Sequence, residues 1–333
     1  MKTLKRPVTG REAWLIALCF FFIAILSATK EMRSYARLNL AYTRLNWDLA
    51  DGASPHKALA WLQASATDSS TAASARYGVA LTHQSAGQYA EAVEAWSHVE
   101  QAPEYLEAWA VLAERSSRLE DAQEWLFVLA NLEPTNGDNW YELARITALS
   151  GDSTAKDYYN RAMTAPLREN VGVSNVLTRL GELEKQAENP DWEHVLALFD
   201  KAIEENAYVD RHDYIVSRMG RAEALERLGR LRKSLDEYRL IIHENPGVYW
   251  AYVHGGRLSW YVEDDAETAI SYLQRAIQLD EKPKWAYLTL GQIYAKTGAI
   301  DLAIDQFQKT LTIDPNDEQA RRQLDTLLNN NEN

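Results

Sequence analysis

Apolar residues recur at steps of three and four along most of this chain, which is the spacing of one face of an α-helix. The first clear example is residues 30–51, where neither Pro nor Gly interrupts the sequence. Its apolar side chains fall on one helical face: Tyr35, Leu38, Tyr42, Leu45 and Leu49. Gly and Pro are sparse and fall at intervals. The pattern therefore predicts an all-α chain of many helices joined by short breaks.

A different pattern, an apolar run without a charge, occupies residues 13–29. A helix of this length rises about 25 Å, slightly less than the hydrocarbon core of a bilayer. Thr9 and Glu12 have the spacing of a capping box at the start of that helix. Residues 10–30 are therefore predicted to form one uncleaved transmembrane helix after a basic tail, residues 1–9. The competing interpretation is a cleaved signal peptide, whose apolar stretch is usually shorter.

The clearest internal repeat runs from Lys284 to Pro315. The residues that define it are Tyr287, Leu290, Gly291, Tyr294, Gly298, Ala303, Phe307 and Pro315. Gly291 and Ala303 are small where two antiparallel helices would touch most closely, and Leu290, Tyr294 and Phe307 would fill the space around that contact. Pro315 would end the second helix because it lacks a backbone donor.

This spacing resembles the tetratricopeptide repeat, which has an aromatic, Leu-Gly and a second aromatic on helix A, then Ala and an aromatic on helix B. The resemblance implies an all-α, right-handed superhelical solenoid of antiparallel helix pairs, here preceded by the transmembrane helix. The same phases recur upstream, which gives a solenoid over residues 31–315 and a capping helix with a frayed tail over residues 316–333. About eight repeats are expected, with approximate bounds 39–70, 73–104, 106–134, 137–168, 174–207, 215–246, 250–281 and 284–315.

Charge is unevenly distributed along the chain, and this narrows the choice of partners. The net charge of −13 combines +5 over residues 1–50 with −18 over the remaining residues. An acidic body repels phosphate backbones, so no nucleic acid is expected as a partner, whereas the basic end suits lipid head groups of a bilayer. Translocating the basic tail would be costly, so the predicted orientation is N-in and C-out, with an extracytoplasmic body; a cytoplasmic body is left open.

Patterns typical of catalytic and metal sites are absent from the sequence. None of the seven histidines forms a His-x-x-x-His or His/Cys pair suited to zinc. Neither a phosphate-binding Gly-x-x-x-x-Gly-Lys loop nor a Gly-x-Ser-x-Gly elbow occurs. We therefore expect no enzyme activity, no metal and no cofactor.

The resemblance also implies a concave groove, lined by the helix A side chains that do not pack within a pair. The candidate partner-binding residues are Tyr141, Arg145, Glu182, Glu223, Trp250, His254, Arg257, Trp285 and Gln292. Aromatic groups mixed with both signs of charge suit an extended peptide or an amphipathic helix. The predicted function is a membrane-anchored protein–protein interaction scaffold, or adaptor, for assembly of a membrane or envelope complex.

The eleven tryptophans leave a second class of function open. Trp250, Trp260 and Trp285 would provide aromatic surface for a glycan, as in an accessory protein for polysaccharide binding, synthesis or export. Trp109 and Trp140 lie at the aromatic phase of helix A in their repeats, so both are expected in the core.

Overall fold

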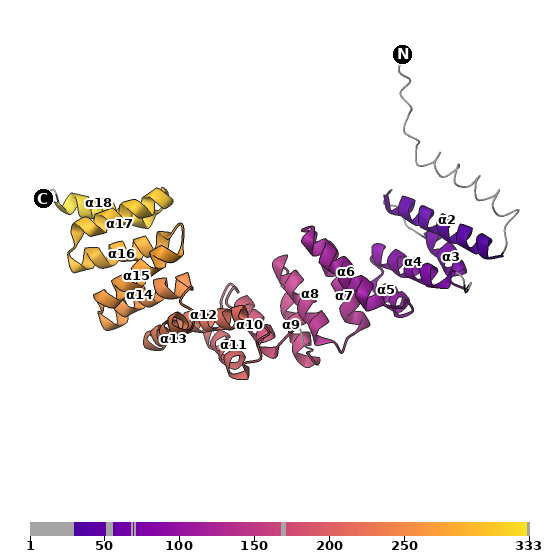
Figure 1. Cartoon of the computed structure of the whole chain (residues 1–333), viewed down its shortest axis with the longest axis horizontal. Helices are drawn as coiled ribbons and strands as arrows, with labels where there is room; N and C mark the ends of the chain where they lie inside the picture. The colour runs from indigo at the N-terminus through magenta and orange to yellow at the C-terminus, as the bar shows by residue number, and fades with distance from the viewer. Residues whose placement is uncertain (1–29, 51–55, 68, 70, 168–170, 332–333) are drawn as a thin grey trace, which may run out of the picture. The chain divides into compact units, whose positions relative to one another are not determined.

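The computed structural model of this protein describes residues 30–50, 56–67, 69, 71–167 and 171–331. These residues form seventeen helices and no strand (Figure 1), which confirms the predicted all-α, tetratricopeptide-like fold. The chain divides into two compact units, an N-terminal unit of residues 1–168 and a C-terminal unit of residues 169–333. The right-handed superhelical twist stays a prediction.

Helices of 9 to 21 residues follow one another in both units. The N-terminal unit contains α2 (Lys30–Ala50), α3 (His56–Ser65), α4 (Ala72–Ser85), α5 (Tyr89–Ser97), α6 (Ala102–Arg115), α7 (Leu119–Leu132), α8 (Gly137–Leu149) and α9 (Ala155–Thr164). The C-terminal unit contains α10 (Val173–Glu184), α11 (Trp192–Glu205), α12 (Arg211–Arg227), α13 (Leu231–Glu244), α14 (Tyr249–Glu263), α15 (Ala266–Leu279), α16 (Lys284–Thr297), α17 (Ile300–Ile313) and α18 (Glu318–Asn331).

Consecutive helices pack as pairs, in which the even-numbered helix is helix A and the next is helix B. Short turns join the two helices of a pair, and several of them depend on glycine. Gly229 and Gly298 follow α12 and α16 with φ values of 71° and 83°, a left-handed conformation that glycine adopts without a side-chain clash. The chain can therefore reverse direction within a few residues and lay helix B against helix A.

Small residues on helix A face large ones on helix B at the centre of a pair. A Cβ atom placed on Gly291 of α16 would lie 2.7 Å from the ring of Phe307 on α17. Phe307 and Ala303 are both fully buried. The contact predicted from the repeat is thus present, and it sets how closely α16 and α17 approach.

The last helix, α18, packs against α17 at the end of the C-terminal unit (Figure 1). Ala320 is fully buried against Phe307, and Leu324 and Leu327 pack at the margin of the same cluster. Their apolar side chains cover a face of the last pair that would otherwise meet water.

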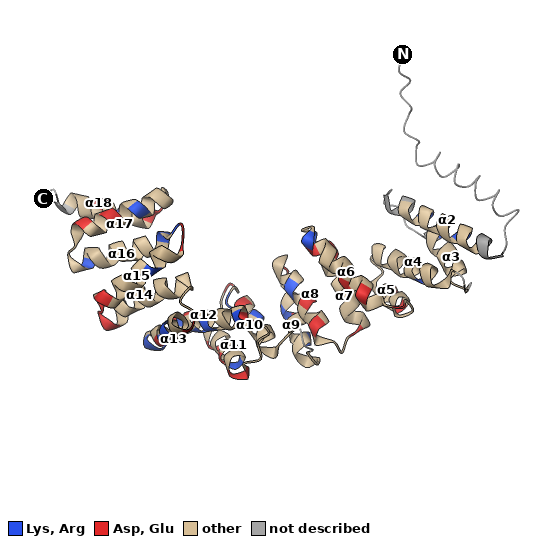
Figure 2. Cartoon of the chain, viewed as in Figure 1, with Lys and Arg blue, Asp and Glu red and all other residues tan. Residues whose placement is uncertain are grey.

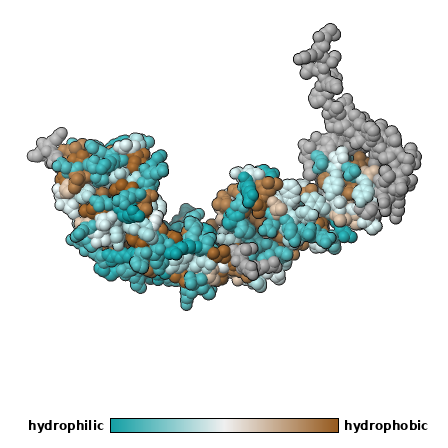
Figure 3. All heavy atoms as spheres, in the orientation of Figure 1, coloured by the Kyte–Doolittle hydropathy of each residue, from teal (hydrophilic) through white to brown (hydrophobic). Residues whose placement is uncertain are grey.

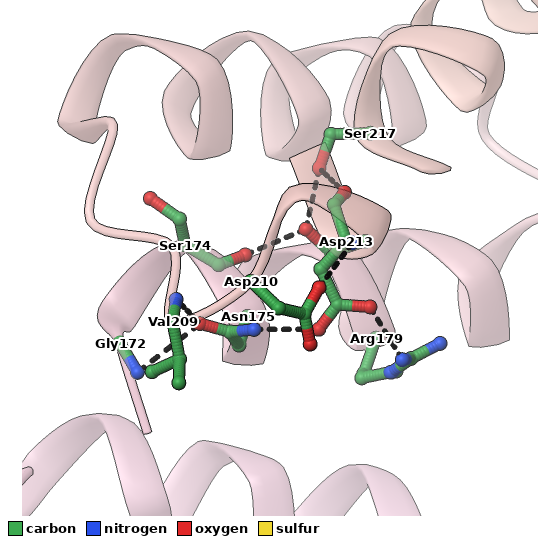
Figure 4. A network of polar contacts seen from close by, with 9 residues as sticks. Gly172, Ser174, Asn175, Arg179, Val209, Asp210, Asp213 and Ser217 are labelled. Atoms are coloured by element: carbon green, nitrogen blue, oxygen red, sulfur yellow. Dashed lines mark hydrogen bonds and ion pairs between the residues drawn. The ribbon is translucent and has the colours of Figure 1, made fainter. Parts of the chain in front are cut away.

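A network of buried polar side chains joins α10 to α12 at the start of the C-terminal unit (Figure 4). At its centre, the carboxylate of Asp213 accepts hydrogen bonds from Asn175 and Arg179, each at 2.5 Å. The Thr178 and Ser217 hydroxyls share a further hydrogen bond of 2.5 Å. Helices A of neighbouring pairs are therefore joined by polar contacts as well as by apolar packing.

Among the residues described, no helix is both long enough and apolar enough to cross a membrane. The predicted transmembrane helix, residues 10–30, lies outside the described residues except for Lys30, and so does the tail of residues 1–9.

Candidate partner-binding site

Seven of the nine candidate residues lie in the C-terminal unit, on the A helices α10, α12, α14 and α16. They are Glu182, Glu223, Trp250, His254, Arg257, Trp285 and Gln292. The remaining two, Tyr141 and Arg145, lie on α8 of the N-terminal unit. We call the row formed by Trp250, His254 and Trp285 the Trp250–Trp285 patch.

Both indoles of the patch are exposed and are held by their neighbours. Trp250 is 43% exposed and Trp285 is 44% exposed, and their ring centroids lie 6.5 Å apart. The edge of Tyr249 meets Trp250 at 5.0 Å, and the Nζ atom of Lys284 lies 4.5 Å from the centre of the Trp285 ring. Lys284 is itself held by Asp314 at 2.8 Å. The two rings thus form a positioned aromatic surface across α14 and α16.

His254 forms the half-buried base of the patch. Its ring stacks on that of Tyr238 from α13 at 5.3 Å and 12°, and the ring of Trp250 tilts against it at 5.8 Å. Nδ1 of His254 has no hydrogen-bond partner in the described part of the chain. Burial is the main cause that lowers the pKa of His254 below its usual 6.5, although Glu226 opposes the shift. The side chain is therefore neutral at pH 7.

This lowered pKa predicts a loss of stability on the acid side. Below about pH 6.5 the unfolded histidine binds a proton that the folded one resists, so the free energy of unfolding falls with pH. Above that pH both states are neutral and the contribution is constant. Urea unfolding of the chain between about pH 7 and pH 5 is expected to show a smaller decline in His254→Gln than in wild type. Equal declines would contradict the assignment.

The charged candidates form ion pairs with charges nearby on their own or a neighbouring A helix. Arg257 of α14 contacts Glu226 of α12 at 2.5 Å. Lys185, which follows α10, contacts Glu223 at 2.9 Å and Glu182 at 3.1 Å. Figure 2 colours both acidic and basic positions along the helices of this unit. The charges therefore compensate one another within the unit, which leaves the aromatic rings as the groups free to contact a partner.

Arg145 forms ion pairs of the same kind in the N-terminal unit. Its guanidinium donates to both carboxylate oxygens of Glu114 on α6, at 2.7 and 2.8 Å, and to Glu142 at 2.8 Å. These hydrogen bonds hold the pKa of Glu114 below its usual value. Arg145 thus couples α8 to α6, which the sequence did not predict.

One tyrosine and one tryptophan differ in burial from what the sequence predicts. Tyr141 is only 7% exposed, because its ring packs edge-on against Tyr159 of α9 at 5.7 Å; it belongs to the core. Trp109 is 40% exposed and stacks on Trp125 at 5.8 Å. On α6, Leu106 is fully buried. It therefore occupies the core position that had been assigned to Trp109, so the repeat pattern begins three residues earlier than predicted.

The other aromatic and amide candidates need less correction. Trp140 is 4% exposed, as predicted for a core residue. Trp260 packs on the apolar cluster around Leu273 and is only partly exposed. Gln292 is partly exposed on α16. Figure 3 shows apolar and hydrophilic surface interspersed over the helices of the C-terminal unit.

Among the described residues, no group of three or more His, Cys, Asp or Glu side chains is placed to hold a metal ion.

Comparison with known families and proteins agrees with the repeats and the fold. Residues 263–328 match the tetratricopeptide repeat family. The chain is 30% identical over 92 residues to the mitochondrial import receptor subunit TOM70 of Homo sapiens, and equally to that of Rattus norvegicus. The match covers 28% of this chain but only 15% of TOM70. The chain therefore corresponds to a small part of these relatives.

Solved structures are similar over a larger share of the chain. PilF of Pseudomonas aeruginosa has a TM-score of 0.55 at 12% identity and covers 67% of this chain and 96% of its own. PilW, a widely conserved type IV pilus biogenesis factor, has a TM-score of 0.53 at 15% identity and covers 69% of this chain and 100% of its own. At these identities the likeness concerns the fold, a solenoid of tetratricopeptide type.

Proposed function

We propose that this chain is a protein–protein interaction scaffold that binds a partner peptide or helix at the Trp250–Trp285 patch. Tetratricopeptide proteins bind protein partners, and the family match at residues 263–328 includes Trp285. The observation that carries the proposal is the pair of exposed indoles, 6.5 Å apart on neighbouring A helices. We propose a binding role without catalysis.

The chemistry of the patch favours a protein ligand. Tryptophan dominates binding energy at protein interfaces when a partner desolvates it. Trp250 and Trp285 are held by Tyr249 and Lys284, so little side-chain entropy is lost when a partner covers them. Because Arg257 and Glu226 are already paired, a partner with one or two apolar anchors fits the patch better than a highly charged one.

Membrane anchoring belongs to the same proposal. Its basis is the uncharged run at residues 13–29 between basic residues. The anchor, residues 10–30, would hold the solenoid at a bilayer, with the body on the extracytoplasmic side, where the chain would help to assemble a membrane or envelope complex.

The full chain, solubilised with detergent from the membrane fraction, is expected to co-purify with a defined protein. Capture by the Trp250→Ala/Trp285→Ala variant should fall about tenfold or more, because loss of two interface anchors costs at least about 1.4 kcal/mol. Tyr261→Ala is the matched control, since Tyr261 lies on the same helix α14 and is 72% exposed. Equal capture by both variants would contradict the assigned patch, and recovery only from the soluble fraction would contradict the anchor.

A polysaccharide ligand would use the same two indoles. Trp260, the third ring considered for a glycan, packs on the core, which leaves a short aromatic surface. Titration of glycans against the tryptophan fluorescence of the chain separates the two classes. A fluorescence change with a glycan that is lost in Trp250→Ala/Trp285→Ala would replace the protein ligand by a polysaccharide.

A further inference from the structure

A second aromatic site lies in the N-terminal unit, at a pocket of about 350 Å³. Three tyrosines line it, one from each of the helices α2, α4 and α6: Tyr42, Tyr77 and Tyr105. The turn that precedes α6 completes the wall with Glu100 and Gln101. The volume is at the lower end of the range for ligand pockets, so it suits one side chain of a partner.

The rings of this pocket are fixed by their contacts. The Tyr42 hydroxyl donates to the backbone carbonyl of Ser74. The Tyr77 hydroxyl accepts a hydrogen bond of 3.2 Å from Nε1 of Trp109, and the Tyr77 ring meets that of Tyr105 edge-on at 5.4 Å. Burial raises the pKa of Tyr42 to about 12, so this phenol is neutral. The pocket therefore presents preformed aromatic surface without a positive charge.

Among the described residues that line the pocket, Glu100 alone carries a carboxylate. Glu100 is exposed, and it forms no ion pair or hydrogen bond with any residue that the structure describes. Residues 30–134, which include all three helices that line the pocket, contain fourteen Asp or Glu against eight Lys or Arg, a balance of −6. This contrasts with the Trp250–Trp285 patch, where the neighbouring charges compensate one another. The pocket thus combines aromatic rings with an uncompensated negative charge.

We infer that this pocket binds the guanidinium group of an arginine side chain on a partner peptide. The negative faces of aromatic rings attract cations, and arginine takes this role more often than lysine. The planar guanidinium can also stack on a tyrosine while it donates two parallel hydrogen bonds to the Glu100 carboxylate. The inference rests on the proposed function, since it takes the ligand to be a protein, but it assigns a separate site in the other unit.

The test uses a fluorescein-labelled Gly/Ser peptide that carries arginines, titrated against the full chain in detergent and followed by anisotropy. The same peptide with citrulline, a neutral isostere of arginine, is expected to bind about tenfold more weakly. Glu100→Gln and Tyr105→Ala should each weaken binding of the arginine peptide by about fivefold to tenfold. Both residues are exposed, so these changes do not disturb the core.

The matched control is Glu107→Gln, which removes the same charge from the exposed surface of α6 outside the pocket. Its effect should stay below about twofold, because exposed charges act weakly at a distance. Equal losses in Glu100→Gln and Glu107→Gln, or equal affinity for the citrulline peptide, would overturn the inference. No natural partner takes part in this titration, so its outcome is independent of capture at Trp250 and Trp285.

Discussion

Asp213→Ala is expected to lower the free energy of unfolding of the C-terminal unit by about 3–5 kcal/mol. The Asp213 side chain is only 3% exposed, and its carboxylate accepts hydrogen bonds from Asn175 and Arg179, each at 2.5 Å. Removing one partner of a buried, hydrogen-bonded ion pair leaves the others with a desolvation cost that nothing offsets. Urea unfolding of the full chain, followed by circular dichroism, measures the change.

The same contacts explain why the loss should spread along α10. The amide oxygen of Asn175 accepts from the backbone N–H groups of Gly172 and Val209, at 3.1 and 3.2 Å, while its nitrogen donates to Asp213 (Figure 4). Without the carboxylate, Asn175 loses the contact that orients its side chain. The start of α10 and the turn before α12 would both loosen.

The control for this variant is Asp236→Ala, because Asp236 is exposed on α13 of the same unit. Its effect should stay within about 0.5 kcal/mol. Asp213→Asn keeps the shape of the side chain and removes only the charge, so it should fall between the two. If Asp213→Ala unfolded at the same urea concentration as Asp236→Ala, the network would not stabilise the unit.

The helix pairs could be predicted from the sequence because their signals are local. A small residue such as Gly291, and an aromatic such as Phe307 a fixed number of residues later, report one steric contact inside one pair. Glycines with positive φ, such as Gly298, mark the turns in the same way. Because these local signals repeat along the chain, the fold could be predicted without any long-range information.

The polar contacts between pairs could not be predicted in this way. Asn175 and Asp213 are 38 residues apart, and each looks in the sequence like an ordinary solvated residue near a helix start. Arg257 was likewise expected to face a partner, whereas it pairs with Glu226, 31 residues away. Only the stacking of neighbouring pairs shows that these side chains meet.

The error at α6 has a different physical origin. Trp109 was expected in the core because it fits the aromatic position of helix A in its repeat. The structure buries Leu106, Ala110 and Ala113 and leaves Trp109 on the surface. Close approach of helices favours small residues at the contact, so alanine spacing was the better guide than aromatic size. Because Trp109 was expected in the core, its contact with Tyr77 at the second aromatic site was not predicted.

Gly220→Ala is expected to lower the free energy of unfolding of the C-terminal unit by about 1–3 kcal/mol. A Cβ atom on Gly220 would lie 2.3 Å from the ring of Phe199, which is fully buried. Gly181 confines the same ring, because a Cβ there would lie 2.7 Å from it. Alanine gains up to about 1 kcal/mol over glycine from helix propensity, but the overpacked ring lies between two helices and has little room to move.

A glycine with more room around it provides the control. A Cβ atom on Gly255 of α14 would meet its nearest neighbours at 3.4 Å, an ordinary contact. Gly255→Ala is therefore expected to be neutral or to stabilise the unit by up to about 1 kcal/mol. Phe199→Leu should relieve the clash, so Gly220→Ala should cost less in that background, with a coupling of about 0.5–3 kcal/mol. Additive effects of Gly220→Ala and Phe199→Leu would show that the close approach of α10, α11 and α12 does not depend on this glycine.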